Sequence, residues 1–232
     1  MSVESVAVRP HMCMCVLHLG GASFTEDSLK AFIDAQTAIH DGIGRRRAAC
    51  AIGTHDMATI PPGGLTVDAC PAAEVVLVPL KAMEEECEGG AAPQPRSAAA
   101  VIAAALADTS RDGAASGARK YASELAGIPR VPVLLDATGA VLSLPPLTNA
   151  VHSRVTLETK TILVECSSIE SLAVCRAASL ELIARTVAIF ETGPDEAAAA
   201  ATVLMQPVSV LNGWGQAHAR ATFPLWDELR RN

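Results

Sequence analysis

The side chain with the clearest potential for chemistry is Glu165, which interrupts the apolar run TILVEC at 161–166. Alternation along an extended strand places Glu165 on the same face as Leu163 and Ser167. Because Leu163 makes that face partly apolar, a carboxylate there needs hydrogen-bond donors from the protein, from water or from a ligand. Two interpretations stay open: Glu165 captures a loop amide, or it binds a ligand.

The residues before Glu165 alternate between strands and turns. Two apolar strands are predicted on either side of the turn Asp136-Ala137-Thr138-Gly139, and Pro145-Pro146 predicts an extended segment. The strand that carries Glu165 follows. We therefore expect residues 131–168 to form one compact unit whose polar atoms face a shared pocket.

A basic cluster, Arg45-Arg46-Arg47, precedes a predicted strand and then the sequence GTHD at 53–56, which is typical of a turn. The cluster is either a solvated loop beside a turn whose Asp or Thr bonds its own backbone, or a site for phosphate, which guanidinium groups bind in bidentate fashion. Neighbours on an extended chain point to opposite sides, which argues against an acid–base pair of His55 and Asp56. No GxSxG motif precedes His152-Ser153, so a serine hydrolase triad is not expected.

Composition limits the class of protein. The chain has 232 residues, of which 50% are hydrophobic, and this length predicts one sizeable domain over 1–232. It has no apolar run of about eighteen residues and no secretory signal, so we expect a cytoplasmic protein without a membrane span. A net charge of −7 argues against a free-standing nucleic-acid binder, DNA-binding proteins included. Seven cysteines without CxxC spacing indicate reduced core thiols rather than a metal site.

Hydrophobic spacing predicts the elements that must position these groups. A strand is expected at 12–19, a helix capped by Thr25 and ended by Gly42 and Gly44, and strands at 48–52 and 74–80. The helix stripe comprises Leu29, Phe32, Ile33, Gln36 and Ile39. Residues 84–117 are interpreted as a low-complexity Ala/Gly-rich surface insertion with one helix, 169–190 as the main core helix, and 193–232 as a C-terminal strand and tail.

Three stretches, which include GTHD, DATGAVLSLPP at 136–146 and HSRVTLETKTILVE at 152–165, together resemble the B3/B4 domain of the phenylalanyl-tRNA synthetase beta subunit in its archaeal and eukaryotic form. The resemblance covers residues 8–83 and 119–192, with a weaker echo at 222–224. It implies an α/β (α+β) fold, a three-layered domain with β-sheets packed around helices. It also implies an editing esterase, which hydrolyses mischarged tyrosyl-tRNA(Phe) in support of aminoacylation.

The resemblance further implies roles for particular residues. Leu134, Asn149 and Glu165 would bind the substrate, while Ser143 and Ser167 would hold the ester or a water molecule. Pro146 and the turn at 149–152 would shape the pocket wall, and Arg45, Arg46 and Arg47 would contact RNA. Archaeal relatives often have Asp at the position of Glu165 and Thr at that of Ser167.

No metal or cofactor is implied, because ATP and Mg belong to the aminoacylation core, which we do not expect in this chain. The implied partners are tRNA(Phe) and the synthetase alpha subunit or the remainder of the beta subunit. One alternative is a non-catalytic tRNA-binding and assembly module with a degenerate pocket. Another is the binding of a small ligand or protein outside translation.

Overall fold

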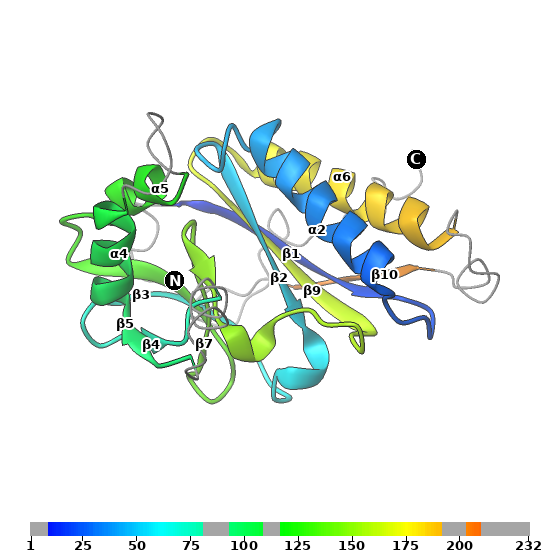
Figure 1. Ribbon diagram of the computed structural model, residues 1–232, viewed down its shortest axis with the longest axis horizontal. Helices are drawn as coiled ribbons and strands as arrows, with labels where there is room; N and C mark the ends of the chain where they lie inside the picture. The colour runs from blue at the N-terminus through cyan, green and yellow to red at the C-terminus, as the bar shows by residue number, and fades with distance from the viewer. Residues whose placement is uncertain (1–8, 81–92, 109–116, 192–202, 210–232) are drawn as a thin grey trace. The chain divides into compact units, whose positions relative to one another are not determined.

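Helices and antiparallel sheets make up the fold in a computed structural model that describes residues 9–80, 93–108, 117–191 and 203–209 (Figure 1). The chain divides into two units. The described parts of Met1–Pro10 and Ile60–Arg154 form one, which we call the β6 unit, and those of His11–Thr59 and Val155–Asn232 form the other, the β9 unit. The chain thus leaves the β9 unit at residue 60 and returns at 155.

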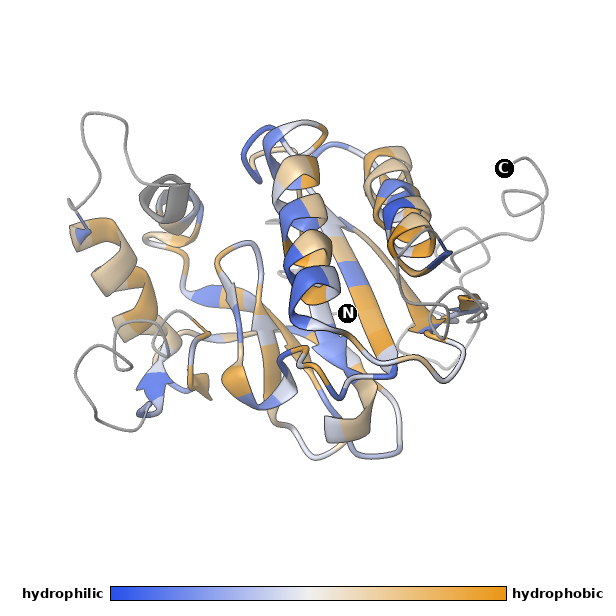
Figure 2. Ribbon diagram, turned by 45° about the vertical axis from the view of Figure 1, so that its right-hand side comes forward, coloured by the Kyte–Doolittle hydropathy of each residue, from blue (hydrophilic) through white to orange (hydrophobic). Residues whose placement is uncertain are grey.

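The β9 unit contains a four-stranded antiparallel sheet in the order β10-β1-β9-β2. Its strands are β1 (His11–His18), β2 (Cys50–Asp56), β9 (Thr161–Ser168) and β10 (Leu204–Pro207). Helices α2 (Glu26–Asp41) and α6 (Leu172–Glu191) pack against each other and against these strands (Figure 1). Figure 2 shows hydrophobic strands beneath these helices and polar residues along the outer side of α2.

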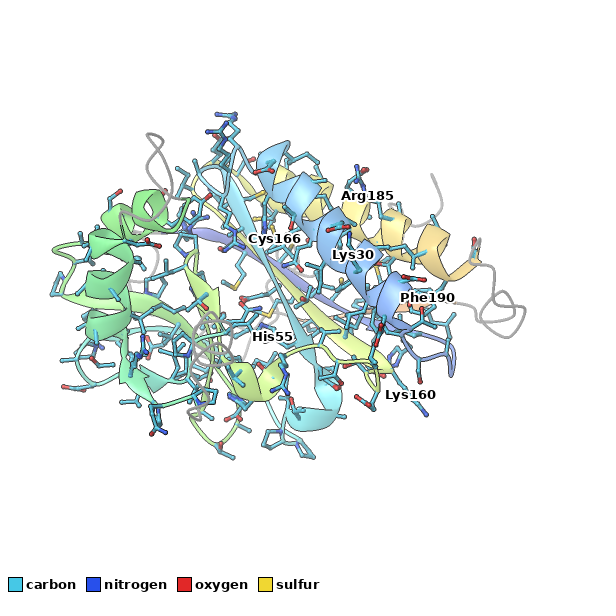
Figure 3. All side chains as sticks on the ribbon, in the orientation of Figure 1. Lys30, His55, Lys160, Cys166, Arg185 and Phe190 are labelled. Carbon is cyan, nitrogen blue, oxygen red and sulfur yellow. The ribbon has the colours of Figure 1, made fainter. Side chains whose placement is uncertain are left out.

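The core of the β9 unit follows from strand alternation. Ile162, Val164 and Cys166 of β9 belong to the cluster that includes Phe32 of α2 and Leu182 of α6. The helices therefore cover this face of the sheet, and Leu163, Glu165 and Ser167 lie on the other face, as predicted. Lys30 and Arg185 lie on the outer sides of the two helices, where they pair with Asp34 and Glu181 (Figure 3).

Helix α2 begins where the sequence predicts. The Thr25 side chain accepts a hydrogen bond from the Ser28 amide at 3.2 Å, and the Ser28 hydroxyl accepts one from the Thr25 amide at 2.8 Å. This reciprocal pair is a capping box, and Gly42 ends the helix. The predicted stripe is wrong at Ile33, which is exposed, because the buried face turns instead toward Ala35 and His40.

The β6 unit contains a second antiparallel sheet in the order β3-β6-β7-β8, formed by β3 (Thr66–Pro71), β6 (Arg130–Leu135), β7 (Val141–Leu144) and β8 (Thr148–Asn149). A small sheet pairs β4 (Val76–Leu77) with β5 (Arg96–Ser97). Helices α4 (Ala98–Ala107) and α5 (Gly117–Leu125) pack against each other. Their core includes Val101, Ile102 and Leu125 together with Val131 and Val133 of β6.

The turn predicted at Asp136-Ala137-Thr138-Gly139 is confirmed and connects β6 to β7. The Asp136 carboxylate accepts hydrogen bonds from the Thr138 amide at 2.8 Å, the Thr138 hydroxyl at 2.7 Å and the Ala140 amide at 2.9 Å. Gly139 adopts a φ of 85°, a conformation that favours glycine. The Asp-Ala-Thr-Gly sequence is therefore the structural reason for this hairpin.

Four other expectations need correction or qualification. GTHD lies inside β2, which is buried throughout, and not in a turn. The strand expected at 74–80 shortens to β4, while β3 has no counterpart among the predicted strands. Residues 131–168 do not form one compact unit, since they span both units. The alanine-rich helix expected within 84–117 exists as α4, but it contributes buried side chains to the core and is not a surface excursion.

The remaining expectations on organisation have mixed outcomes. The core helix is α6, and β10 lies within the strand expected before the C-terminal tail. Residues 84–92, 109–116, 193–202 and 210–232, which include the tail and the echo at 222–224, lie outside the described residues, and the single-domain boundary of 1–232 stays a prediction. Among the described residues, no helix has the length and apolar character needed to cross a membrane.

Candidate functional site

Three of the predicted site residues form a row across the sheet of the β6 unit. Leu134 of β6 lies opposite Ser143 of β7, and Ser143 lies opposite Asn149 of β8. Directly opposed residues in antiparallel strands share a face, so the three side chains are neighbours. This face is opposite to the one that carries Val131 and Val133 into the core.

The centre of this row is a buried hydroxyl. Ser143 is 1% exposed, and its Oγ atom has no hydrogen-bond partner among the residues that the structure describes. Leu134 is fully buried beside it, and Asn149 is half-buried at the edge of the sheet. An unpartnered buried hydroxyl costs about 1–3 kcal/mol, so Ser143 is suited to a ligand or a bound water molecule.

The other two predicted residues, Glu165 and Ser167, lie on β9 in the β9 unit, two positions apart on the same face. Both are buried, with 3% and 1% of their surface exposed. Glu165 lies opposite Met14 of β1 on one side and opposite Gly53 of β2 on the other. Its carboxylate therefore stands at the middle of the sheet and does not reach bulk solvent.

Gly53 makes room for that carboxylate. A Cβ atom at position 53 would collide with Oε1, Cγ and Cδ of Glu165. The Glu165 side chain thus lies across β2, in the space that any residue other than glycine would fill. The Glu165 carboxylate can therefore take this position only because residue 53 of the strand is glycine.

His55 holds one oxygen of the same carboxylate. Its Nε2 atom lies 3.4 Å from Oε1 of Glu165, and both side chains are buried. The second oxygen, Oε2, is enclosed and has no hydrogen-bond partner among the described residues. The site therefore offers the Glu165 carboxylate, whose Oε2 atom can accept a hydrogen bond from a ligand.

Sequence reasoning missed both Gly53 and His55 as parts of the site. The sequence predicts a turn at GTHD, which relates His55 only to its neighbour Asp56, and the two side chains do lie on opposite faces of β2. Asp56 accepts hydrogen bonds from the Ala58 amide at 2.9 Å and the Thr159 hydroxyl at 2.7 Å, which is a structural role. Strand alternation places Gly53 and His55 on one face, and this pattern is the sequence signal that could identify both as parts of the site.

The predicted site residues are therefore brought together as two sets, one in each unit. Leu134, Ser143 and Asn149 form the first set, and Glu165 and Ser167 form the second. Each set contains a buried polar atom without a hydrogen-bond partner in the described chain, Ser143 Oγ and Glu165 Oε2. Their convergence on one pocket stays a prediction.

The basic cluster forms a left-handed turn between α2 and β2. Arg45, Arg46 and Arg47 have φ angles of 48°, 56° and 63°, which non-glycine residues rarely adopt. Arg45 pairs with Glu170 at 2.8 Å, whereas Arg46 is exposed. Strain of this kind is often retained at functional sites, and the RNA-binding role of these residues stays a prediction.

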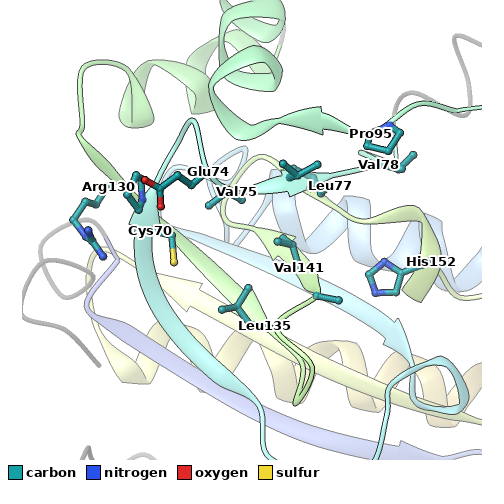
Figure 4. A pocket seen from close by; sticks show the side chains of 14 residues that line it. Cys70, Glu74, Val75, Leu77, Val78, Pro95, Arg130, Leu135, Val141 and His152 are labelled. Atoms are coloured by element: carbon teal, nitrogen blue, oxygen red, sulfur yellow. The ribbon is translucent and has the colours of Figure 1, made fainter.

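A separate depression of 810 Å³ lies on the β6 unit (Figure 4). Arg130, Glu74 and Cys70 stand at one end, His152 stands at the other, and apolar side chains line the space between them. None of the five residues of the predicted editing pocket lines it. His152 and Ser153 lie in the 3-10 turn η2 (Val151–Ser153), where the Ser153 hydroxyl donates to the Ala150 carbonyl.

The thiols of the β9 unit are structural. Cys13, Cys15, Cys50, Cys166 and Cys175 are reduced and buried, and burial raises the pKa of Cys15 to about 12. Hydrogen bonding to Cys175, together with burial, raises the pKa of Cys13 and Cys166. Cys87 is outside the described residues, within which no cluster of three His, Cys, Asp or Glu side chains is arranged to hold a metal ion.

Comparison with known proteins relates the chain to one family. Over 167 residues it is 35% identical to the cytoplasmic phenylalanine–tRNA ligase beta subunit of Arabidopsis thaliana, and over 164 residues it is 31% identical to the phenylalanine–tRNA ligase beta subunit of Homo sapiens. Each match covers 71% of this chain and 24% of the relative, so the chain spans about a quarter of their length. No protein-family model matches. The family resemblance drawn from the sequence motifs is confirmed.

A solved structure supports the fold. An N-terminal fragment of the phenylalanyl-tRNA synthetase beta subunit from Pyrococcus horikoshii matches with a TM-score of 0.69 and 21% identity, covering 94% of this chain and 52% of that chain. The expected α/β (α+β) fold class is confirmed.

Proposed function

Because the chain belongs to the same family as a segment of the phenylalanine–tRNA ligase beta subunit, we propose that it is an editing module that hydrolyses tyrosine wrongly esterified to tRNA(Phe). The observation that carries the proposal is the buried carboxylate of Glu165, whose Oε2 atom has no donor among the described residues. Such an atom costs free energy unless a ligand supplies the donor. Tyrosine differs from phenylalanine by one hydroxyl group, which is such a donor.

Recognition of that hydroxyl accounts for selectivity. A buried acceptor that pairs with the phenolic hydroxyl leaves itself unpaired when phenylalanine enters, and sites of this kind discriminate by about 10⁴–10⁵. Glu165 is the acceptor, Leu134 packs against the ring, and Asn149 orients the amino acid. Correctly charged tRNA(Phe) would thereby escape hydrolysis.

Hydrolysis of the ester needs a positioned water molecule and support for the developing oxyanion. The hydroxyl groups of Ser143 and Ser167 would hold the water and the ester carbonyl by hydrogen bonds. No metal, ATP or covalent nucleophile takes part in this scheme. Aminoacylation itself would belong to a separate catalytic core.

The partners follow from the same proposal. The substrate is tRNA(Phe), whose phosphates would contact Arg46 and its neighbours on the left-handed turn. The assembly partner would be the ligase alpha subunit or the remainder of a beta subunit. By analogy with the plant relative, the site of action would be the cytoplasm.

The test is to incubate the purified chain with tyrosyl-tRNA(Phe) and measure release of tyrosine, with phenylalanyl-tRNA(Phe) as the second substrate. Glu165→Ala should abolish the preference for the tyrosyl ester, whereas Glu181→Ala, which alters a surface carboxylate on α6, should leave it unchanged. Absence of release by the wild-type chain beside an active intact ligase would contradict the proposal. That outcome would favour the non-catalytic tRNA-binding and assembly module.

A further inference from the structure

The carboxylate of Glu165 has two oxygens in unlike surroundings. Oε1 lies 3.4 Å from Nε2 of His55, while Oε2 is enclosed and has no hydrogen-bond partner in the described chain. A carboxylate that rotated freely would exchange the two oxygens, and both would then serve as acceptors. The contact with His55 distinguishes them.

Gly53 also restricts the path of the Glu165 side chain. Gly53 lies directly opposite Glu165, and Oε1, Cγ and Cδ occupy the space where a Cβ atom of residue 53 would stand. His55 follows two residues later on β2, on the same face, so one short segment supplies both the space and the hydrogen-bond partner. With the Glu165 side chain fixed in this way, Oε2 is the one carboxylate oxygen left to accept a hydrogen bond from a ligand.

We propose that His55 and Gly53 are positioning residues that set the specificity of Glu165, so that the site accepts an aminoacyl group ending in one hydroxyl donor. His55 Nε2–H donates to Oε1, because an ionised carboxylate only accepts hydrogen bonds. Oε2 is thereby reserved for the phenolic hydroxyl of the substrate. The inference rests on the proposed function and extends it to two residues that do not contact the substrate.

The histidine–carboxylate contact is long for a hydrogen bond at 3.4 Å. Contacts of this kind in unliganded sites often shorten when the ligand binds. Because His55 donates a hydrogen bond to Oε1, that oxygen is no longer available to the substrate hydroxyl. A hydroxyl bound at Oε2 then gives each carboxylate oxygen a hydrogen-bond donor. Loss of His55 would let the carboxylate turn or recruit water, which weakens selection for the hydroxyl.

The experiment measures binding of two non-hydrolysable analogues, adenosine carrying a 3′-amide-linked tyrosyl or phenylalanyl group, by titration calorimetry. His55→Leu should reduce the tyrosyl preference by about tenfold, the equivalent of one hydrogen bond. His55→Gln, which retains an N–H donor, should restore most of it. His40→Gln is the matched control, because His40 is also buried beside β2 but accepts from the Ile52 amide.

A second measurement keeps the inference separate from the editing proposal. Nitrogen-15 NMR of the His55 ring should show a proton on Nε2 in the wild-type chain, and the Nε2 signal should shift in Glu165→Ala but not in Glu181→Ala. An unshifted signal, or an unchanged tyrosyl preference in a folded His55→Leu variant, overturns the positioning role. A tyrosyl preference in binding that depends on His55, found while the wild-type chain releases no tyrosine from tyrosyl-tRNA(Phe), supports the positioning role and overturns editing.

Discussion

Gly53 and Glu165 face each other across β2 and β9, and the carboxylate of Glu165 occupies the volume that a side chain at position 53 would need. The glycine is therefore coupled to the acid in space, although the two residues are far apart in the sequence. Substitution at either position alters the same small region of the sheet.

Gly53→Ala should destabilise the protein and displace the carboxylate. The new methyl group would overlap atoms of a buried side chain, and overpacking of this kind costs about 1–3 kcal/mol. The free energy of unfolding, measured in urea, provides the check. Gly64→Ala is the matched control, because a Cβ atom there meets nothing within 4 Å. Equal stability of the two variants would contradict the prediction.

The turn held by Asp136 should give the fold a defined dependence on pH. Burial acts to raise the pKa of Asp136, but hydrogen bonds from Thr138 and Ala140 outweigh it, so the pKa lies below its ordinary value. The carboxylate therefore contributes stability above the unfolded-state pKa of about 3.9, and this contribution is lost as pH falls through the lower folded-state value.

Asp136→Asn should accordingly reduce the free energy of unfolding by about 1–2 kcal/mol at neutral pH, and the difference from wild type should shrink below about pH 4. Urea unfolding at a series of pH values measures this difference. The exposed Asp41→Asn variant serves as the reference. A difference that grows on acidification would have the wrong sign.

Patterns within short segments of the sequence predict much of the fold and part of the site. Alternation identified the faces of β9, a capping pair identified the start of α2, and Asp136 with Gly139 identified a turn. Each of these features depends on contacts within a few residues. The burial of Glu165 was likewise readable, because its neighbours along the strand are apolar.

Other features depend on contacts between distant segments. Gly53 and Asp56 are typical of turns, and only the carboxylate opposite Gly53 explains a glycine in a buried strand. The strand β3 was missed because its sequence TVDACP combines Asp and Pro, which are rare in strands. The division of residues 131–168 between two units follows from the pairing of β9 with β1 and β2, which the sequence of that stretch does not encode.

The five buried thiols should resist modification in the native state. Because burial raises the pKa of Cys15 to about 12, its reactive thiolate is scarce at neutral pH. Mass spectrometry after brief treatment with iodoacetamide should find Cys13, Cys15, Cys50, Cys166 and Cys175 unmodified, while half-buried Cys70 reacts sooner. Unfolded protein is the control, in which all should react. Rapid native labelling of Cys15 would contradict this prediction.

The two sets of predicted site residues should act together if they line one pocket. Ser143→Ala removes a buried hydroxyl and Glu165→Gln exchanges a carboxylate oxygen for an amide NH2 group, and the combined effect on tyrosyl-ester hydrolysis should depart from the sum of the single effects by about 0.5–3 kcal/mol. A double-mutant cycle measured as kcat/KM provides this coupling energy. The matched cycle of Ser143→Ala with Glu181→Gln uses a surface carboxylate and should be additive within about 0.5 kcal/mol. Additivity in both cycles would place Ser143 and Glu165 in independent sites.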